Sequence, residues 1–244
     1  MRKDSFQLVK MDPIAAAREV GYKPVRWRVK IREEVIELTR FVHTVLTAAQ
    51  VPYFILFGTL LGATKWNSII PWDDDSDIGI LLEHVPAALK ALQAALPTSP
   101  FRMSAMAYGY GLYGRDHGIL DLIVFAVDPR TINTADPVYR SCYPLANGKP
   151  TFLNSKICKT ELPSSLLFPL RQYLFEDMLL LGPAQGRELC LRKYGTQVYE
   201  RNERPDKGRG IHPLVPYLLP PLTKVLQAIV DTVDRINPRL FASQ

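Results

Sequence analysis

The sequence has little cysteine, and the few cysteines have no spacing that suggests a shared role. Three occur in 244 residues, at Cys142, Cys158 and Cys190, and none forms a CxxC pair. An odd number of scattered cysteines does not make a disulfide framework, and zinc sites need closely spaced ligand pairs. The four histidines show no ligand spacing either. These absences argue against a disulfide-stapled domain and against a zinc site.

Long hydrophobic runs and dense basic runs are also missing. No stretch reaches the roughly 20 apolar residues that a membrane-spanning helix needs, and residues 1–24 lack the apolar core of a signal peptide. We therefore expect a soluble, cytoplasmic protein with no transmembrane segment. The net charge is +6 at pH 7, but the basic residues are scattered, so nucleic acid is not the expected partner. A basic surface suits a polyphosphate substrate instead.

What the chain does have is a dense group of aspartates. Residues 57–80 read FGTLLGATKWNSIIPWDDDSDIGI, and four of the five positions from 73 to 77 are aspartates: Asp73, Asp74, Asp75 and Asp77. In an extended strand the three odd-numbered side chains share a face. Carboxylates crowded on one face repel one another unless a cation lies between them.

The kind of cation follows from the ligand chemistry. Hard oxygen ligands suit Mg²⁺ or Mn²⁺, which commonly hold substrate phosphates as well. An acidic surface turn is the alternative interpretation of the same residues. Aspartate is a poor strand former, yet the run leads directly into the apolar Ile78 and Ile80. This context favours a metal site beside a phosphate ester.

The same segment resembles the signature of the LicD/fukutin-type phosphotransferases. Two further segments match in the order that the family has. The sequence GILDLIVF at 118–125 places Asp121 inside an apolar strand, and the closing part contains FPLR at 168–171 and LRKYG at 191–195. The resemblance implies an α+β fold, with a nucleotidyltransferase-like mixed β-sheet flanked by helices.

The resemblance covers roughly residues 27–200, and the pattern of the sequence sets the expected organisation around it. We expect residues 1–24 to be a weakly ordered lead-in and residues 25–205 to form the catalytic domain. Residues 206–244 contain a proline-rich segment followed by an amphipathic C-terminal helix. This helix is expected to pack on the domain, and docking on a partner or a peripheral membrane surface is the alternative.

The reaction is likewise implied by the resemblance. Such enzymes move a phospho-alcohol group, such as phosphocholine or a polyol phosphate, from a CDP-linked donor such as CDP-choline to a hydroxyl of a glycan or glycopolymer. CMP is released. One alternative is a nucleotidyltransferase that adds NMP from an NTP to a small molecule or RNA, and another is a non-catalytic binding module of the same fold. The PWDDDSD and PLR contexts favour the phosphotransferase.

Roles for single residues combine the spacing with the match to the family. We expect Asp75 and Asp77 to bind the metal, with Asp73 as a further candidate ligand. Asp121 would be a second-metal ligand or the general base that takes the acceptor proton. A buried ion-pair partner is the alternative role for Asp121.

Phosphate contacts are expected at the Gly-Thr step and at two cations. Gly58 would allow a phosphate to come close, and the backbone N–H groups of Thr59 and Leu60 would open onto it at a helix N-terminus. Lys65 and Arg171 are the candidate phosphate-binding cations, and surface salt bridges are the alternative for both.

The hydrophobic pattern predicts the order of the elements. Helices are predicted over 25–50, 58–66, 86–96 and 184–194, and strands over 53–57, 77–82, 119–127, 171–175 and 178–181, with two more strands inside 101–113. Residues 128–165 are rich in Pro, Asn, Thr and Ser. They are predicted to be one long irregular loop, of the kind that often forms a lid or a binding loop.

Overall fold

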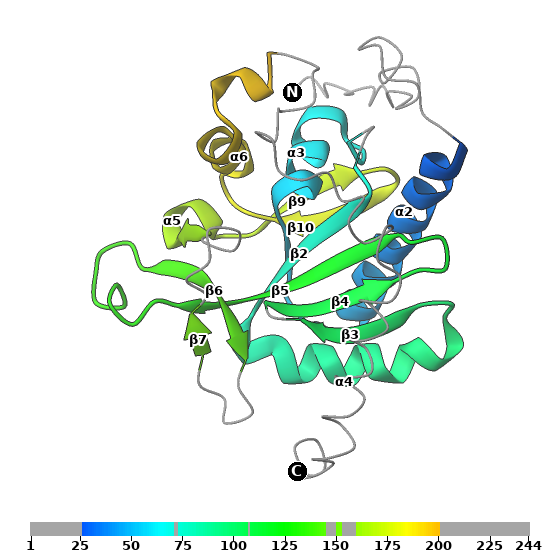
Figure 1. The fold of residues 1–244 in the computed structure, drawn as a ribbon. Helices are drawn as coiled ribbons and strands as arrows, with labels where there is room; N and C mark the ends of the chain where they lie inside the picture. The colour runs from blue at the N-terminus through cyan, green and yellow to red at the C-terminus, as the bar shows by residue number, and fades with distance from the viewer. Residues whose placement is uncertain (1–25, 71–72, 107, 145–149, 153–159, 201–244) are drawn as a thin grey trace, which may run out of the picture. The chain divides into compact units, whose positions relative to one another are not determined.

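The fold is taken from a computed structural model, which describes residues 26–70, 73–106, 108–144, 150–152 and 160–200 (Figure 1). These residues belong to one unit of the chain, residues 1–203. The expected lead-in over residues 1–24 and the expected C-terminal helix lie outside the described residues.

A mixed β-sheet forms the centre of the fold. Its strands run in the order β1 (Phe54–Ile55), β2 (Asp75–Leu81), β5 (Ile119–Val127), β4 (Gly109–Tyr113) and β3 (Arg102–Met106). Strands β2 and β5 are parallel and the other neighbours are antiparallel. The expected mixed β-sheet is therefore confirmed.

Strand β5 is shared by two neighbours along one edge. Strand β4 pairs with residues 119–123, and β6 (Val138–Pro144) pairs with residues 125–127. Strand β6 in turn pairs with β7 (Pro150–Phe152) and β8 (Glu161–Pro163). Where the two neighbours part, the Val124 N–H donates to the carbonyl of Tyr108 at 3.0 Å.

Residues 128–165 are thus not one long irregular loop, and this prediction is wrong. Three strands from this range, β6, β7 and β8, extend the central sheet. The Pro-, Asn- and Thr-rich composition suggested a loop, because pairing with a distant strand leaves little mark on local sequence.

Helices cover one face of the sheet, and alternate side chains of its strands are buried against them. The long helix α2 (Arg26–Ala48) and α4 (Val85–Ala95) pack together on the sheet (Figure 1). The even-numbered side chains of β2 and β5, such as Ile78, Ile80 and Leu122, are buried in one core with residues of both helices. Odd-numbered residues of β5, Ile123 and Phe125, join a second apolar cluster on the opposite face.

The remaining elements pack near the start of β2. Helix α3 (Phe57–Trp66) joins β1 to the segment before β2, and α6 (Gly186–Tyr194) lies against α3. A short helix α5 (Ser164–Leu167) precedes the hairpin of β9 (Arg171–Phe175) and β10 (Met178–Gly182), and a 3₁₀ turn over Thr196–Val198 follows α6. Among the described helices, none combines the length and apolar character that crossing a bilayer requires.

Candidate active site

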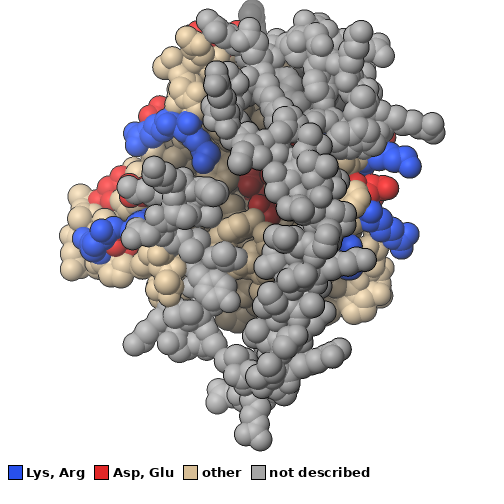
Figure 2. All heavy atoms as spheres, viewed as in Figure 1, with Lys and Arg blue, Asp and Glu red and all other residues tan. Residues whose placement is uncertain are grey.

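Strands β2 and β5 carry three aspartates to one place on the sheet. Asp77 lies directly opposite Asp121 in the parallel register, and Asp75 is two residues earlier on β2. Ser76 alternates to the other face, where its hydroxyl accepts a hydrogen bond from Thr39 of α2 at 3.0 Å. Strand pairing therefore gathers Asp75, Asp77 and Asp121 on the face away from α2. In Figure 2, acidic atoms are recessed near the middle of the face that Figure 1 presents.

These carboxylates raise one another's pKa values. Loss of hydration raises the pKa of Asp77 well above its ordinary range, and the charges of Asp75, Asp121 and Asp73 raise it further. Lys193 opposes this effect. Burial raises the pKa of Asp121 to about 6, against a hydrogen bond from Tyr108 that lowers it. Negative charge is thus concentrated where the two strands begin.

The carboxylate of Asp121 is held on one side only. Its Oδ2 accepts a hydrogen bond from the hydroxyl of Tyr108 at 3.0 Å. Its Oδ1 is buried and has no hydrogen-bond partner. A buried acceptor without a donor is costly unless a ligand completes it, and a hard cation is the kind of ligand that carboxylate oxygens bind.

The donor set therefore fits a divalent cation in its chemistry. Within the described part of the chain, no three His, Cys, Asp or Glu side chains already converge as a metal site. The backbone register brings the carboxylates together, and a cation would be held after the side chains turn toward it. Asp75, Asp77 and Asp121 are the residues that could do so.

Residues of the Gly-Thr step and the following Leu60 make contacts within the fold. Thr59 is buried, and its hydroxyl accepts the Asp77 N–H at 2.8 Å. This bond fixes β2 against α3. The N–H of Leu60 donates to the carbonyl of Leu56 at 2.8 Å, so the expectation that it opens onto a phosphate is wrong. Gly58 remains close to the site, because a Cβ there would meet Oδ2 of Asp73.

The two expected phosphate cations, Lys65 and Arg171, lie on α3 and β9. Lys65 donates from Nζ to the carbonyl of Val198 at 2.8 Å and lies 4.5 Å from the ring centroid of Trp66. It is eight residues beyond Phe57, which corresponds to about 12 Å along the helix. Arg171 is exposed at the start of β9.

Two residues near the aspartates were missed in the analysis of the sequence. Lys193 of α6 holds Nζ 3.9 Å from the ring centroid of Phe57, and its charge lowers the pKa of Asp77. Burial and the charges of Asp77, Asp73 and Asp75 raise the pKa of its neighbour Tyr194. The LRKYG segment contains both residues, but nothing in the sequence shows which side of the helix faces β2.

A pocket of about 200 Å³ has Lys193 and Tyr194 in its lining. Its walls come from the start of α3, from β8 and from α6, and they include Phe57, Leu162, Lys193 and Tyr194. Lys193 and Tyr194 also interact electrostatically with Asp77, which links the pocket to the carboxylates. With a cation held at the aspartates, the arrangement could bind an anionic group there and a less polar group in the pocket.

Comparison with known proteins gives both sequence and structural relatives. Residues 50–185 match the family described as LicD/FKTN/FKRP, nucleotidyltransferase domain. The human protein named ribitol 5-phosphate transferase FKRP is 53% identical over 173 residues, which cover 70% of this chain and 33% of that protein. The uncharacterized protein RP689 of Rickettsia prowazekii (strain Madrid E) is 49% identical over 163 residues, 65% of this chain and 53% of that one.

Among solved structures, the crystal structure of ANT(2")-Ia in complex with adenylyl-2"-tobramycin is similar to this chain. The match covers 81% of this chain and 97% of that one, with a TM-score of 0.42 and 12% identity. The chain spans about a third of the length of the human relative.

Proposed function

This chain belongs to the LicD/FKTN/FKRP family, and on that premise we propose that it is a phosphotransferase acting on a CDP-linked donor. The enzyme would move a phospho-alcohol group, phosphocholine or a polyol phosphate, to a hydroxyl of a glycan or glycopolymer. The name of the human relative, a ribitol 5-phosphate transferase, favours a polyol phosphate. The observation that carries the proposal is the gathering of Asp75, Asp77 and Asp121 on paired strands.

The transfer is a displacement at phosphorus. The acceptor oxygen attacks the phosphorus distal to cytidine, the bond from that phosphorus to the bridging oxygen breaks, and CMP leaves with the bond's electrons. The acceptor hydroxyl loses its proton. The donor already contains the reactive anhydride, so the protein must position it, neutralise charge and accept that proton.

Asp121 is suited to accept the proton or to hold a cation. With a pKa of about 6 it is mostly ionised at neutral pH and close enough to that pH to exchange protons efficiently. Tyr108 fixes one of its oxygens, which leaves the other directed to a ligand. Gly58 keeps the start of α3 open beside Asp73, where backbone N–H groups favour an anion.

Mg²⁺ or Mn²⁺ is the proposed cofactor. Asp75 and Asp77 would hold it, with Asp121 as a possible third ligand and Asp73 nearby. Bound there, the ion would neutralise phosphate oxygens and the charge that builds up on the leaving CMP. The crowding that raises the pKa of Asp77 supports the proposal, since a cation would relieve it.

A donor panel tests the proposal directly. The purified chain with Mg²⁺ would be incubated with CDP-ribitol, CDP-glycerol, CDP-choline and the four NTPs, and release of CMP and of pyrophosphate would be measured. We expect slow CMP release from a CDP-linked donor, with water attacking in place of the glycan hydroxyl, and we expect it to be abolished by EDTA and by Asp75→Asn or Asp77→Asn. Asp74→Asn, in the same acidic run, is the matched control and should retain the activity. Pyrophosphate release from NTPs without CMP release from any CDP donor would replace this proposal with nucleotidyl transfer.

A further inference from the structure

Helix α6 brings a cation to the point where α3 begins. The Nζ of Lys193 lies 3.9 Å from the ring centroid of Phe57, the first residue of α3. The first N–H groups of a helix and its dipole make that end electropositive. The ammonium group and the helix end thus add positive potential at the same place.

The same ammonium group lies within electrostatic reach of the aspartates. Its charge acts on Asp77, and the adjacent Tyr194 responds to Asp77, Asp73 and Asp75. Lys193 also lines the pocket of about 200 Å³, whose walls include Leu56, Leu60 and Leu162. It therefore stands at the boundary between the carboxylates and this largely apolar pocket.

A diphosphate at this site would meet a shortage of positive charge. Asp75, Asp77 and Asp121 already repel one another, and one divalent ion does not neutralise both these carboxylates and a diphosphate. A further cation must face the phosphates from the side opposite the strands. Lys65 donates to Val198 and Arg171 is exposed on the hairpin, whereas Lys193 lines the pocket and its charge acts on Asp77.

We propose that Lys193 is a substrate-binding residue that contacts the diphosphate of the donor and sets it between the aspartates and the pocket. The inference rests on the proposed function, because it takes the donor to be a nucleoside diphosphate ester. Lysine suits this role as a compact point charge with three donors. Stacking on Phe57 keeps the ammonium in place before the donor arrives.

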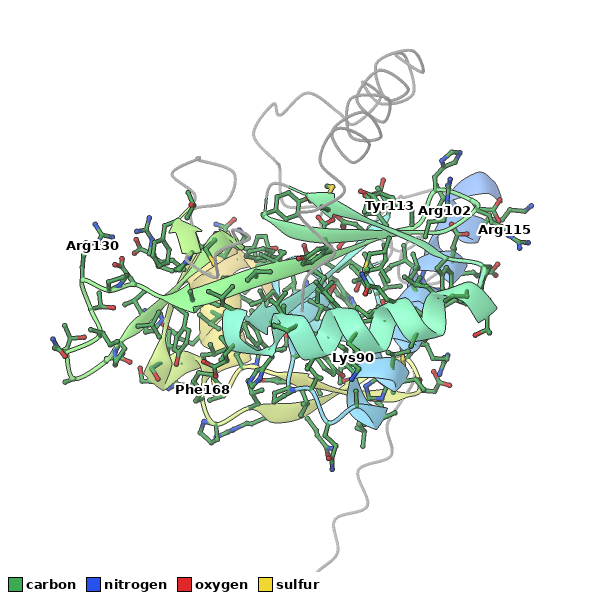
Figure 3. The ribbon with its side chains drawn as sticks, turned by 90° about the horizontal axis from the view of Figure 1, so that it is seen from below. Lys90, Arg102, Tyr113, Arg115, Arg130 and Phe168 are labelled. Atoms are coloured by element: carbon green, nitrogen blue, oxygen red, sulfur yellow. The ribbon has the colours of Figure 1, made fainter. Side chains whose placement is uncertain are left out.

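Binding of CDP in the presence of Mg²⁺ tests this role without the acceptor. Calorimetry would compare the wild type with Lys193→Met and Lys193→Gln, which remove the charge, and Lys193→Arg, which keeps it. Lys90→Met, on the exposed side of α4 (Figure 3), is the control. We expect the charge-removing variants to weaken CDP binding roughly 10- to 100-fold, Lys193→Arg to lose less, and Lys90→Met to bind as the wild type does.

A second measurement separates Lys193 from the metal ligands. Binding of Mn²⁺ alone, followed by electron paramagnetic resonance, should be unchanged or tighter in Lys193→Met, because a positive charge near the carboxylates is removed. Asp77→Asn should lose both Mn²⁺ and CDP. A variant that loses Mn²⁺ together with CDP would make Lys193 a structural support of the metal site and overturn the inference.

Failure of the inference and failure of the proposed function give different results. Wild-type protein that binds CDP, with Lys193→Met and Lys193→Gln binding it equally well, would overturn only the role of Lys193. Wild-type protein that binds CDP no better than cytidine would contradict the proposed function, and the inference with it.

Discussion

A single hydroxyl group, that of Tyr108, orients the carboxylate of Asp121. It donates to Oδ2 at 3.0 Å, and the backbone of Tyr108 is itself fixed by the bond from Val124. Groups that hold a catalytic or metal-binding carboxylate in place commonly matter almost as much as the carboxylate does. Nothing in the sequence marked Tyr108, because it lies outside the motifs that resemble the family.

Replacing Tyr108 by Phe should lower turnover about 10- to 100-fold. The loss comes from a less well oriented Asp121, so the affinity for CDP and the melting temperature should change little. Tyr113→Phe is the matched control, since its hydroxyl donates to the sulfur of Met106 at 3.0 Å (Figure 3 shows where Tyr113 lies). Equal turnover in Tyr108→Phe and wild type would mean that the hydroxyl does not orient the reacting group.

A second carboxylate, Asp128, follows the C-terminal end of β5. Its pKa is lowered, whereas the pKa of Asp121 is raised. Its side chain accepts hydrogen bonds from Arg130, at 3.0 Å from Nε, and from Arg140 at 3.2 Å. These two arginines, Arg130 above all, hold the pKa of Asp128 well below its usual range. Asp128 follows β5, and the step of seven residues from Asp121 to Asp128 spans roughly 23 Å of extended strand, so this pair is remote from the aspartates of the site.

The sign of the effect follows from the lowered pKa. A carboxylate whose folded pKa is depressed stabilises the fold at every pH above its unfolded pKa of about 3.9, and this contribution is lost as the pH falls toward the lower folded value. We expect Asp128→Asn to be less stable than wild type by the same amount at pH 7 and pH 5, with a gap that narrows below about pH 4. Urea unfolding at each pH measures this. A gap that stays constant down to pH 3 would show that the ion pairs do not account for the difference.

At the scale of elements, one side chain of α2 fixes the turn that leads into β5. The carboxylate of Glu34 is 8% exposed and accepts the backbone N–H groups of Arg115, of Asp116 at 2.9 Å and of Gly118 at 2.6 Å. The turn needs Gly114, because a Cβ there would meet this carboxylate. The buried acceptor anchors the β4–β5 turn, and β5 then carries Asp121 in a fixed register.

Glu34→Gln should lower the free energy of unfolding by about 2–3 kcal/mol. The amide that replaces one oxygen would face backbone donors and leave at least one N–H unpaired. Glu37→Gln, exposed on the same helix, should change the stability by less than about 0.5 kcal/mol. Chemical denaturation of both variants measures the two free energies of unfolding. Similar losses in the two would contradict the anchoring role of Glu34.

The elements with strong local signals were the ones that the sequence predicted well. Strand β5 lies where the apolar run of residues 119–127 predicted it, and the β9–β10 hairpin lies over 171–182 as expected. Strands β6 and β8 were missed. Their stability comes from pairing with β5 and with each other, and such long-range pairing cannot be read from local composition.

At the scale of the whole molecule, Glu176 connects three separate parts of the chain. From the β9–β10 turn its carboxylate accepts hydrogen bonds from Arg32 of α2 at 2.7 Å and from Ser68, before β2, at 2.5 Å. The side chains of Arg32 and Glu176 are 17% and 8% exposed. A neighbouring pair, Arg40 and Asp177, joins the same helix and turn, but its side chains are 44% and 62% exposed.

The two pairs should contribute very differently to stability. Glu176→Gln leaves a largely buried guanidinium without its carboxylate and should cost about 3 kcal/mol or more. Asp177→Asn removes an exposed pair and should cost less than about 1 kcal/mol. Denaturant unfolding of the two variants gives the comparison. If Asp177→Asn proved the more damaging, burial would not be the factor that separates them.

The pocket and the place of Lys193 in its wall could not have been predicted from the sequence, because the pocket is built from several separate segments. Its walls come from residues near 56–60, 160–162 and 189–194, which meet only in the folded chain. The aspartates were predictable because β2 supplies two of them at a spacing of two residues. Lys65 is close to the motif in sequence, whereas the proximity of Lys193 to Asp77 arises only in the folded chain.

Because β4 and β6 share one edge of β5, most of this strand is paired on both sides, which affects the exchange of its amide protons with solvent. Residues 119–123 and Phe125 have strand partners on both sides, drawn from β2, β4 and β6. Successive N–H groups of such a strand point to opposite neighbours, so the whole strand is exposed to solvent only when the pairings on both sides open. In deuterium exchange, β5 should therefore be among the last segments to acquire label, and β3, paired on one side only, among the first strands to do so.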